Sequence, residues 1–391
     1  MGSSGLVRIA CFLLLRWGFR GDTLARLSTV GRVVRSFRPT PSRDSILLHL
    51  ARDVRIGGYV ADINDRTASN LVRFFGLMGP EIHVDFGLTD WNQWWRLRYP
   101  RQVWSPVPQR LSRFGLVVTD DPNRVACRYD AMWTLRYVLA PEPPGDPLAC
   151  HLPYQMSPML LMSQGEPRGL DKLRASPRPI RILFAGSTTK ELYDRVDYLG
   201  GRFGKQTRWA LLEHLRSHGR LVEVTSRREL DRLIARGCSS GMVMVDSARV
   251  EVSPETWLEL LASADFFFCP PGQIMPLCHN IVEAMAVGTI PLTNYPDWLS
   301  PPLVDGREAL VFDTLESLDA AVGRALAMDR DDIARMRLAV SGYHDEHLDC
   351  RRVAKRLAAR RHEPLRLTIT DEVFHRVEAV PATFSSDCRG R

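Results

Sequence analysis

The stretch Phe266–Asn294, FFFCPPGQIMPLCHNIVEAMAVGTIPLTN, decides the fold of this 391-residue chain. It opens with an apolar run that ends at a Pro-Pro-Gly turn, a pattern typical of a buried strand followed by a loop. Residues 280–287 then show helical periodicity, Gly288 is placed to end that helix, and residues 290–293 form the next apolar run. Strand, helix and strand in this order predict one unit of a parallel sheet.

The same alternation continues on both sides of this unit. Further strands are predicted at 180–184, 221–224, 242–245 and 309–312, with helices at 207–217, 227–236, 253–263 and from 315 to about 343. Short strands with helices between them predict a doubly wound α/β domain. Because such sheets bind ligands outside the carboxyl ends of their strands, we expect the binding residues in the loops that follow the strands.

The first half of the chain shows a weaker version of the pattern. Strands are predicted at 45–50, 82–86 and 115–119, and a helix at 69–77. The loop-forming sequence ASPRP at 175–179 precedes a new strand and marks a domain boundary. We therefore predict two Rossmann-like domains, at 1–175 with an Arg-rich lead-in and at 176–345, followed by a basic, partly helical tail at 346–391.

The composition limits the class of protein. Hydrophobic residues make up 45% and charged residues 25% of the chain, which excludes a disordered, collagen-like or coiled-coil protein. The net charge of +7 fits an anionic ligand or a membrane surface, but acidic residues interrupt the basic ones throughout, so no nucleic-acid partner is expected. No apolar run approaches the ~20 residues that span a bilayer. The chain contains no Cys-x-x-Cys pair, so we expect free thiols and a cytoplasmic location, with peripheral membrane contact left open.

The segment 266–294 also carries most of the candidate binding residues. Gly272 permits a tight turn and a close approach of a ligand to the backbone. The helix start near His279 and Asn280 offers free N–H groups and the positive end of a dipole, which suit a phosphate. Glu283 lies one turn further on, where its carboxylate can accept hydrogen bonds from two ribose hydroxyls. A solvated position for Glu283 is the alternative, and Gln273 is a further polar candidate in the turn.

Two motifs in this half resemble known enzymes. Glu283–Pro291 (EAMAVGTIP) and Leu303–Phe312 (LVDGREALVF) are similar to the donor-binding segment of group 1 glycosyltransferases of the GT-B fold. The strings FAG at 184–186, TRWAL at 207–211 and FCPPG at 268–272 resemble the second domain of exostosin-like glycosyltransferases. The resemblance covers roughly residues 180–345, and it implies two Rossmann-like domains that face a cleft.

The resemblance also implies roles for individual residues. Glu283 would hold the ribose of a nucleotide sugar, and the turn that contains Gly272 would face the diphosphate. Arg208 would be a cation that pairs with phosphate, close to Gly186 at the strand end. Lys190 follows the loop at 186–189 and is a second candidate for phosphate. Many retaining enzymes of this class carry another glutamate eight residues before the first, but Met275 stands at that position here.

The first domain supplies candidates for a general base. In a GT-B enzyme this domain presents the acceptor, and an inverting enzyme needs a carboxylate or a histidine there. His49 and Asp53 follow the first predicted strand, and Asp85 and Asp90 follow the second. The sequence does not choose among these four residues.

Taken together, the residues and the resemblance imply a glycosyltransferase, and more narrowly a hexosyltransferase of polysaccharide biosynthesis. It would move a sugar from a nucleotide-diphosphate sugar to a glycan or glycolipid acceptor, with no metal and no cofactor besides the donor. Two alternatives stay open: a nucleotide-sugar epimerase of the same fold, and a glycan- or nucleotide-binding protein without catalysis. The donor sugar, the stereochemical outcome and the oligomeric state are not specified by the sequence.

Overall fold

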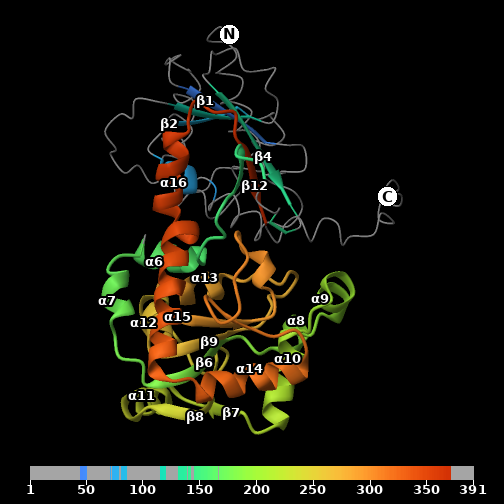
Figure 1. The fold of residues 1–391 in the computed structure, drawn as a ribbon, viewed down its shortest axis with the longest axis vertical. Coiled ribbons are helices and arrows are strands. Elements are labelled where there is room, and N and C mark those ends of the chain that lie inside the picture. The colour runs from blue at the N-terminus through green and yellow to red at the C-terminus, as the bar shows by residue number, and fades with distance from the viewer. Residues whose placement is uncertain are drawn as a thin grey trace, which may run out of the picture.

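The computed structural model describes residues 45–50, 71, 73–78, 81–85, 115–119, 131–138, 140–141, 145–165 and 167–370. Within these ranges the chain forms two six-stranded sheets, and every strand pair in them is parallel. Figure 1 shows the two sheets at opposite ends of the molecule, with helices packed around the second one. The prediction of two parallel α/β units is therefore confirmed.

The first sheet has the strand order β2-β3-β1-β4-β12-β5. Its strands are β1 (Ser45–Leu50), β2 (Glu81–Asp85), β3 (Gly115–Thr119), β4 (Ala131–Tyr137), β5 (Ala149–His151) and β12 (Arg366–Ile369). The second sheet has the order β11-β10-β9-β6-β8-β7. Its strands are β6 (Ile180–Gly186), β7 (Leu221–Val224), β8 (Cys238–Asp246), β9 (Ala264–Cys269), β10 (Ile290–Thr293) and β11 (Leu310–Val311).

The described helices lie mostly in the second half of the chain. They are α6 (Pro158–Gln164), α7 (Leu170–Arg174), α8 (Lys190–Tyr193), α9 (Val196–Phe203), α10 (Arg208–Ser217), α11 (Arg227–Arg236), α12 (Pro254–Ala262), α13 (His279–Ala286), α14 (Leu315–Ala327), α15 (Arg330–Tyr343) and α16 (Cys350–Ala359). Thr207 begins α10, because its side chain accepts a hydrogen bond from the Ala210 N–H.

The core of the second unit explains why its strands are continuously apolar. All six residues of β9 are buried, including Phe266, Phe267 and Phe268 at 0% exposure. Successive side chains of a strand point to opposite faces, so a fully buried strand requires helices on both sides of the sheet. α10 and α14 pack together, as do α12 and α13, and the two pairs supply that cover.

The order of strands reverses beside β6. From β6 the chain crosses to β7 at the edge of the sheet, comes back to β8 beside β6, and then crosses to β9 on the other side of β6. Connections that leave in opposite directions open a crevice at the carboxyl ends of the two central strands, which is where open α/β sheets bind ligands. A ligand is therefore expected at the carboxyl ends of β6 and β9.

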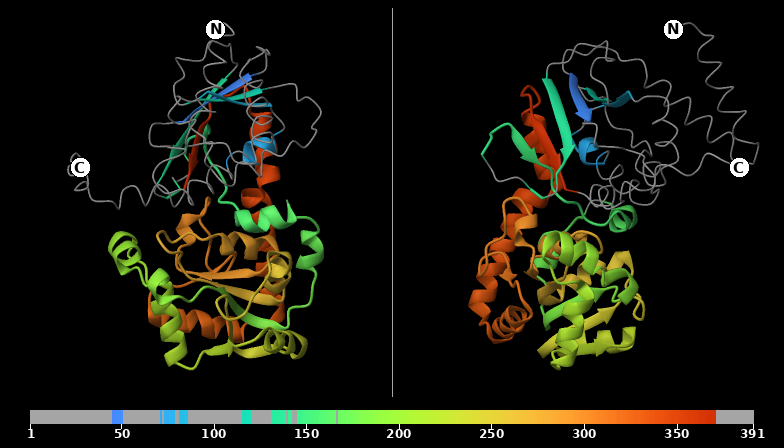
Figure 2. Two further views of the ribbon diagram at one scale, coloured as in Figure 1. Left: turned by 180° about the vertical axis from the view of Figure 1, so that it is seen from behind. Right: turned by 90° about the vertical axis from the view of Figure 1, so that its right-hand side faces the viewer.

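The end of the chain crosses back to the first sheet. α15 is followed by a π-helical turn at His344–Leu348, then by α16, and β12 pairs with β4 and β5. Figure 2 shows α16 rising from the second unit toward the first. The tail predicted at 346–391 is thus partly helical, but its strand β12 is an integral part of the first sheet, which the sequence did not predict.

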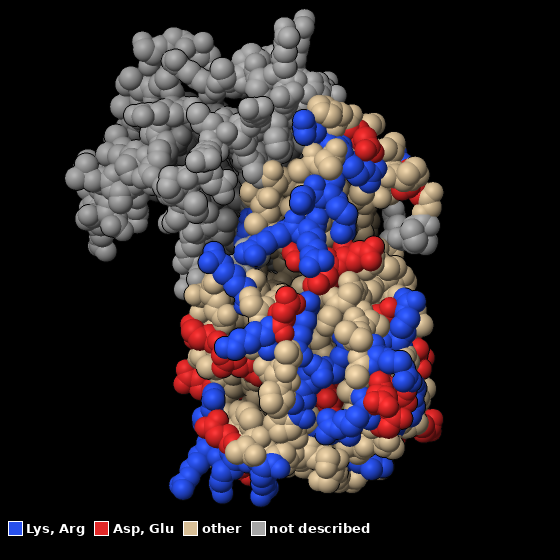
Figure 3. All heavy atoms as spheres, turned by 60° about the vertical axis from the view of Figure 1, so that its left-hand side comes forward, with Lys and Arg blue, Asp and Glu red and all other residues tan. Residues whose placement is uncertain are grey.

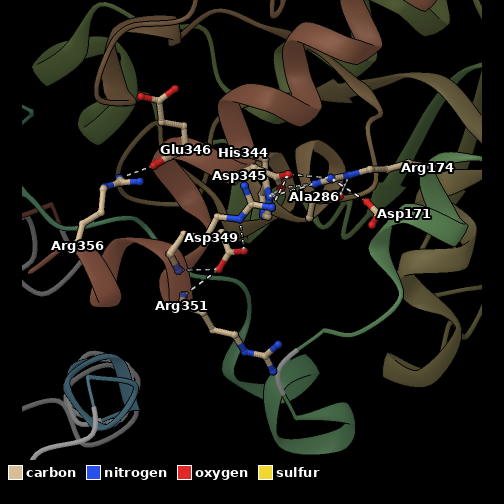
Figure 4. Close-up of polar contacts among 10 residues, drawn as sticks. Asp171, Arg174, Ala286, His344, Asp345, Glu346, Asp349, Arg351 and Arg356 are labelled. Atoms are coloured by element: carbon tan, nitrogen blue, oxygen red, sulfur yellow. Dashed lines mark hydrogen bonds and ion pairs between the residues drawn. The ribbon is translucent and has the colours of Figure 1, made fainter. Parts of the chain in front are cut away.

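The crossing is held by Arg174 at the end of α7 (Figure 4). Its guanidinium donates to the Ala286 carbonyl at 2.9 Å and pairs with Asp345 in the π-helical turn at 2.6 Å. A hydrogen bond from His344, together with the Arg174 charge, holds the pKa of Asp345 below its ordinary value. Arg174 therefore ties α7, α13 and the crossing segment together.

The described surface carries mixed charge, and Figure 3 shows Lys and Arg side chains interspersed with Asp and Glu. Within the described ranges, no helix is both long enough and apolar enough to cross a membrane. The Arg-rich lead-in at 1–44 and the last part of the tail at 371–391 lie outside the described residues.

Substitution of Gly288 tests how closely the end of α13 packs against α15. It has a φ of 71°, and a Cβ added there would lie 2.9 Å from Ser341 Oγ. Gly204 has a similar φ of 62° with nothing within 4 Å. A left-handed conformation costs a residue with a Cβ about 1–2 kcal/mol, so Gly204→Ala is expected to lose that amount of unfolding free energy. Gly288→Ala is expected to lose more, and equal losses in urea unfolding followed by circular dichroism would contradict the packing described.

Candidate functional site

Three of the predicted binding residues meet where β6 and β9 end. Gly186 is the last residue of β6, and a Cβ placed on it would lie 3.6 Å from Asn280 Nδ2 and 3.8 Å from Arg208 Nη1. Asn280 lies in the first turn of α13 and donates from Nδ2 to the Ala185 carbonyl at 3.4 Å. The residues come from three elements separated by long stretches of chain, so the fold brings them to one point.

Arg208 lies at the centre of this group. It is the first residue of α10 and is only 3% exposed. Its Nε donates to the Pro271 carbonyl at 3.2 Å, and its Nη1 donates to the Ser187 carbonyl at 3.2 Å. Its Nη2 lies 3.8 Å from Cys278 Sγ, and the guanidinium carbon lies 3.8 Å from the centre of the Tyr193 ring. One side chain therefore joins the loops that follow β6 and β9.

The charge of Arg208 has no carboxylate partner among the described residues. Its contacts there are two carbonyl groups, a thiol and the face of an aromatic ring. Buried charges in proteins are normally paired, because the desolvation of an ion costs several kcal/mol. Three of the five guanidinium N–H groups are used, which leaves two donors and a full positive charge for an anion.

The loop after β9 is shaped by Gly272. A Cβ at this position would lie 2.8 Å from the Met275 carbonyl oxygen, so only glycine fits the fold of this loop. The Gly272 N–H donates to the Pro276 carbonyl at 3.0 Å and closes the turn. Gln273 is partly exposed beside it, whereas Met275 is fully buried. Met275, eight residues before Glu283, is therefore part of the core.

Glu283 is buried, so the alternative of a solvated position is wrong. It is 2% exposed, and its Oε1 accepts a hydrogen bond from the Ser157 N–H at 2.7 Å. Its Oε2 accepts one from Trp257 Nε1, also at 2.7 Å. Each carboxylate oxygen therefore has a protein partner, and one lone pair on each oxygen remains. The ribose role of Glu283 stays a prediction, and in the described structure the side chain joins α13 to α12 and to the segment before α6.

The segment between β5 and α6 runs past the start of α13. The ring of Tyr154 stacks on His279, with ring centres 5.8 Å apart. Ser157, three residues later, is held by Glu283. These two contacts join the segment that follows β5 of the first sheet to α13 of the second unit, so α13 lies at the junction of the two units.

Lys190 lies at the edge of the group. Its ammonium group pairs with Asp194, one turn along the chain, and lies 5.0 Å from the centre of the Trp209 ring. Asp194 also accepts a hydrogen bond from the Thr207 hydroxyl at 3.0 Å. These bonds hold the pKa of Asp194 below its ordinary value. The structure thus gives Lys190 a carboxylate partner, in contrast to Arg208.

Two residues after β10 belong to the same edge of the sheet. Asn294 and Tyr295 are buried, and neither Asn294 Oδ1 nor the Tyr295 hydroxyl has a hydrogen-bond partner in the part of the chain that the structure describes. Burial raises the pKa of Tyr295 well above its ordinary value, and the positive charge of Arg208 opposes this rise. Lys205 donates to the Asn294 carbonyl. Asn294 and Tyr295 were not predicted from the sequence, although they directly follow a predicted strand.

Two of the four candidate general bases, His49 and Asp85, lie in strands of the first sheet. His49 and Asp85 each pair in register with Thr119, so the three backbone positions form one row across β1, β3 and β2. With strands about 4.8 Å apart, this row separates the outer two backbones by roughly 10 Å. Asp53 and Asp90 lie outside the described residues.

The described residues hold one group of side chains with the composition of a metal site, His214, His218 and Asp319. It lies at the far end of α10, and Arg208 at the other end of this helix has no such group beside it in the described ranges. The candidate site is therefore built from a cation, backbone N–H groups and amides, which suits an anionic ligand.

The buried charge of Glu283 predicts a pH dependence. Burial raises the pKa of this carboxyl above its ordinary value of 4.5, against its two hydrogen bonds. The folded state therefore binds the proton more tightly than the unfolded state, and the stability contributed by the carboxyl falls as pH rises through the raised pKa. Wild-type unfolding free energy should decline relative to Glu283→Gln over that range, by about 1.4 kcal/mol for each pH unit that separates the pKa of the folded state from that of the unfolded state.

Urea unfolding at a series of pH values measures this difference. Glu259→Gln, which replaces an exposed carboxylate on α12, serves as the matched control and should follow the wild type. Parallel pH profiles for wild type and Glu283→Gln would show that the carboxyl is not buried as described.

No family model matches the chain, and no curated protein sequence matches it. Solved structures that resemble it include AviGT4, a glycosyltransferase involved in avilamycin A biosynthesis, at 15% identity and a TM-score of 0.37 over 82% of this chain and 97% of that one. An α,α-trehalose-phosphate synthase (UDP-forming) from Burkholderia xenovorans matches at 11% identity and a TM-score of 0.35, over 82% and 100%. HepE from Anabaena in complex with UDP matches at 10% identity and a TM-score of 0.36, over 81% and 98%. Similarity at this level does not transfer an activity to this chain.

Proposed function

We propose that this chain is a glycosyltransferase of the GT-B fold that uses a nucleotide-diphosphate sugar. The observation that carries the proposal is the buried Arg208 guanidinium, which has no carboxylate partner among the described residues and lies where the strand order of the second sheet reverses. Open α/β sheets bind their ligands at this point, and an unpaired buried cation there favours an anionic ligand.

The surroundings of Arg208 favour a diphosphate over a single carboxylate. α13 begins at His279, and the first N–H groups of a helix bind phosphate well. Lys205 adds a second cation at the end of β10, and two partly exposed amides are Gln273 in the loop after β9 and Asn280 in the first turn of α13. Several donors from α10, the loop after β9 and α13 therefore surround one place, which suits a group with many acceptor oxygens.

The proposed reaction needs little more from this domain than charge stabilisation. The bond between the sugar carbon and the diphosphate oxygen breaks, and negative charge grows on that oxygen. Arg208 and the α13 N–H groups would stabilise this charge, so the leaving diphosphate needs no metal ion. The acceptor hydroxyl loses its proton as its oxygen bonds to the sugar carbon.

The first domain would present the acceptor in this proposal. His49 and Asp85, whose backbone positions lie in one row of the first sheet, are candidates to take the proton from the acceptor hydroxyl in an inverting reaction, as are Asp53 and Asp90. The proposed acceptor is a glycan or a glycolipid, and the proposed donor sugar is a hexose. Glu283 is proposed to reach the ribose through the lone pairs that Ser157 and Trp257 leave unused.

The diphosphate site is tested with nucleoside diphosphates alone. UDP, GDP and ADP are titrated by calorimetry into the wild type, Arg208→Gln and Arg216→Gln. Arg216 lies on the same helix, where it pairs with Glu213 and Glu223, and it is the matched control. Because hydrogen bonds to a charged group contribute about 1.5–3 kcal/mol, Arg208→Gln should weaken binding of the preferred diphosphate by roughly 10- to 150-fold.

Arg208 also links two loops, so Arg208→Gln could weaken binding by disturbing these loops. A second variant in the same group tests for that effect. Asn280→Ala removes one partly exposed amide from the same group and is expected to weaken binding less, with an unchanged melting temperature in the absence of ligand. Binding that is equally strong in wild type and Arg208→Gln, or no binding of any diphosphate, would overturn the proposal. Nucleotide release that needs no acceptor would favour the epimerase.

A further inference from the structure

A pair of histidines lies at the end of α10 that is opposite to Arg208. His214 is in the last turn of the helix, and His218 follows four residues later at its C-terminal cap. Residues four apart on a helix lie on the same face, and here the two ring centres are 4.2 Å apart. Asp319, on the neighbouring helix α14, completes the group, with its Oδ2 2.8 Å from His214 Nε2. One potential ligand atom from each residue lies within 4.8 Å of the others.

The backbone already orients one of these rings. His218 Nδ1 lies 2.8 Å from the His214 carbonyl oxygen, which accepts a hydrogen bond from it. The proton is therefore on Nδ1, and the lone pair is on Nε2. A ring nitrogen fixed by a backbone carbonyl is the usual support of a metal-binding imidazole, because it sets both the tautomer and the orientation of the ring.

The carboxylate has an unused oxygen. Asp319 Oδ1 is buried and has no hydrogen-bond partner among the described residues. Burying an unsatisfied carboxylate oxygen is costly, and the contact of Asp319 with His214 engages the other oxygen, Oδ2. His218 is exposed, so solvent ions can reach the group.

We propose that His214, His218 and Asp319 form a binding site for a divalent transition metal ion, with Zn²⁺ as the physiological candidate. Two imidazoles and one carboxylate are a ligand set for zinc, with water in the fourth position, whereas Mg²⁺ and Ca²⁺ prefer oxygen ligands alone. At zinc–ligand distances of about 2.0–2.2 Å, tetrahedral ligand atoms are roughly 3.4 Å apart, so the side chains close inward by rotamer changes. Metal binding at His214 Nε2 requires this nitrogen to lose its proton to solvent, and the neutral ring then carries its proton on Nδ1.

The site would join α10 to α14 through the metal. Arg208 and His214 lie on the same helix, about 9 Å apart along its axis at 1.5 Å per residue. Metal binding therefore restrains the helix that carries the proposed diphosphate-binding cation. The site itself does not depend on the proposed function, because its two histidines lie at the end of α10 opposite to Arg208.

The test uses metal ions alone with the full chain. Zn²⁺ is titrated by calorimetry, and Co²⁺ is titrated with visible spectroscopy as a substitute that reports its ligands. The variants are His218→Ala, which removes an exposed side chain, and Asp319→Asn, which keeps the shape and one acceptor. His362→Ala, at another exposed histidine, is the control. Melting temperatures without metal show whether each variant is folded.

We expect one Zn²⁺ per chain, a Co²⁺ spectrum without thiolate charge-transfer bands, and a higher melting temperature with Zn²⁺. His218→Ala should bind Zn²⁺ at least about 100-fold more weakly. Loss of a partner that only supports a ligand weakens metal binding by up to about 100-fold, so loss of a ligand itself should cost at least as much. Asp319→Asn should also bind more weakly, and His362→Ala should match the wild type. Affinity that is unchanged in His218→Ala and Asp319→Asn, or thiolate bands that show cysteine ligation, would overturn the proposal. The metal titrations involve no nucleotide. Failure of the metal-site proposal can therefore be distinguished from failure of the diphosphate-site proposal.

Discussion

The second half of the molecule depends on a buried guanidinium that joins two loops. Arg208 donates to the carbonyl groups of Ser187 and Pro271, which follow the two central strands β6 and β9. These contacts satisfy its hydrogen bonds in part, but they do not neutralise its charge. Keeping such a charge out of water is costly, and an anion at the same edge of the sheet would offset that cost. The buried guanidinium of Arg208 therefore explains both the arrangement of the two loops and the proposed binding of an anion.

The same edge of the sheet collects other polar groups that the core would otherwise exclude. Tyr295 and Asn294 are buried directly after β10 without described partners for their side-chain oxygens, and Lys205 reaches the backbone beside them. Buried polar groups are nearly always hydrogen-bonded, so these two oxygens are available to a ligand or to water. Glu283 differs from them, because both of its oxygens accept hydrogen bonds from protein donors.

Much of the fold was predictable because the strands are short apolar runs bounded by turn residues. The predicted strands at 45–50, 115–119, 221–224 and 290–293 agree with the structure residue for residue. Strand β12 was missed because Arg366–Ile369 (RLTI) is short and half polar, and its partner strand β4 lies more than 200 residues earlier. Local periodicity carries no information on such a pairing.

The candidate site was predictable only in part, for the same reason. Gly186, Arg208 and Asn280 were expected at strand ends and a helix start, and the structure brings them together. The partners of Glu283 were not predictable, because Ser157 is 126 residues away and its backbone N–H leaves no mark on the sequence. The burial of Arg208 likewise depends on Pro271, 63 residues further along the chain.

The proposed glycosyltransferase activity of this chain depends on the binding of a nucleotide-sugar diphosphate by Arg208, whereas the proposed metal site does not. The most direct test is a crystal structure determined from crystals soaked with the nucleoside diphosphate that binds best. We expect phosphate oxygens about 3 Å from the Arg208 guanidinium and from the first N–H groups of α13. A nucleotide bound elsewhere, with the contacts of Arg208 unchanged and no phosphate near them, would contradict it.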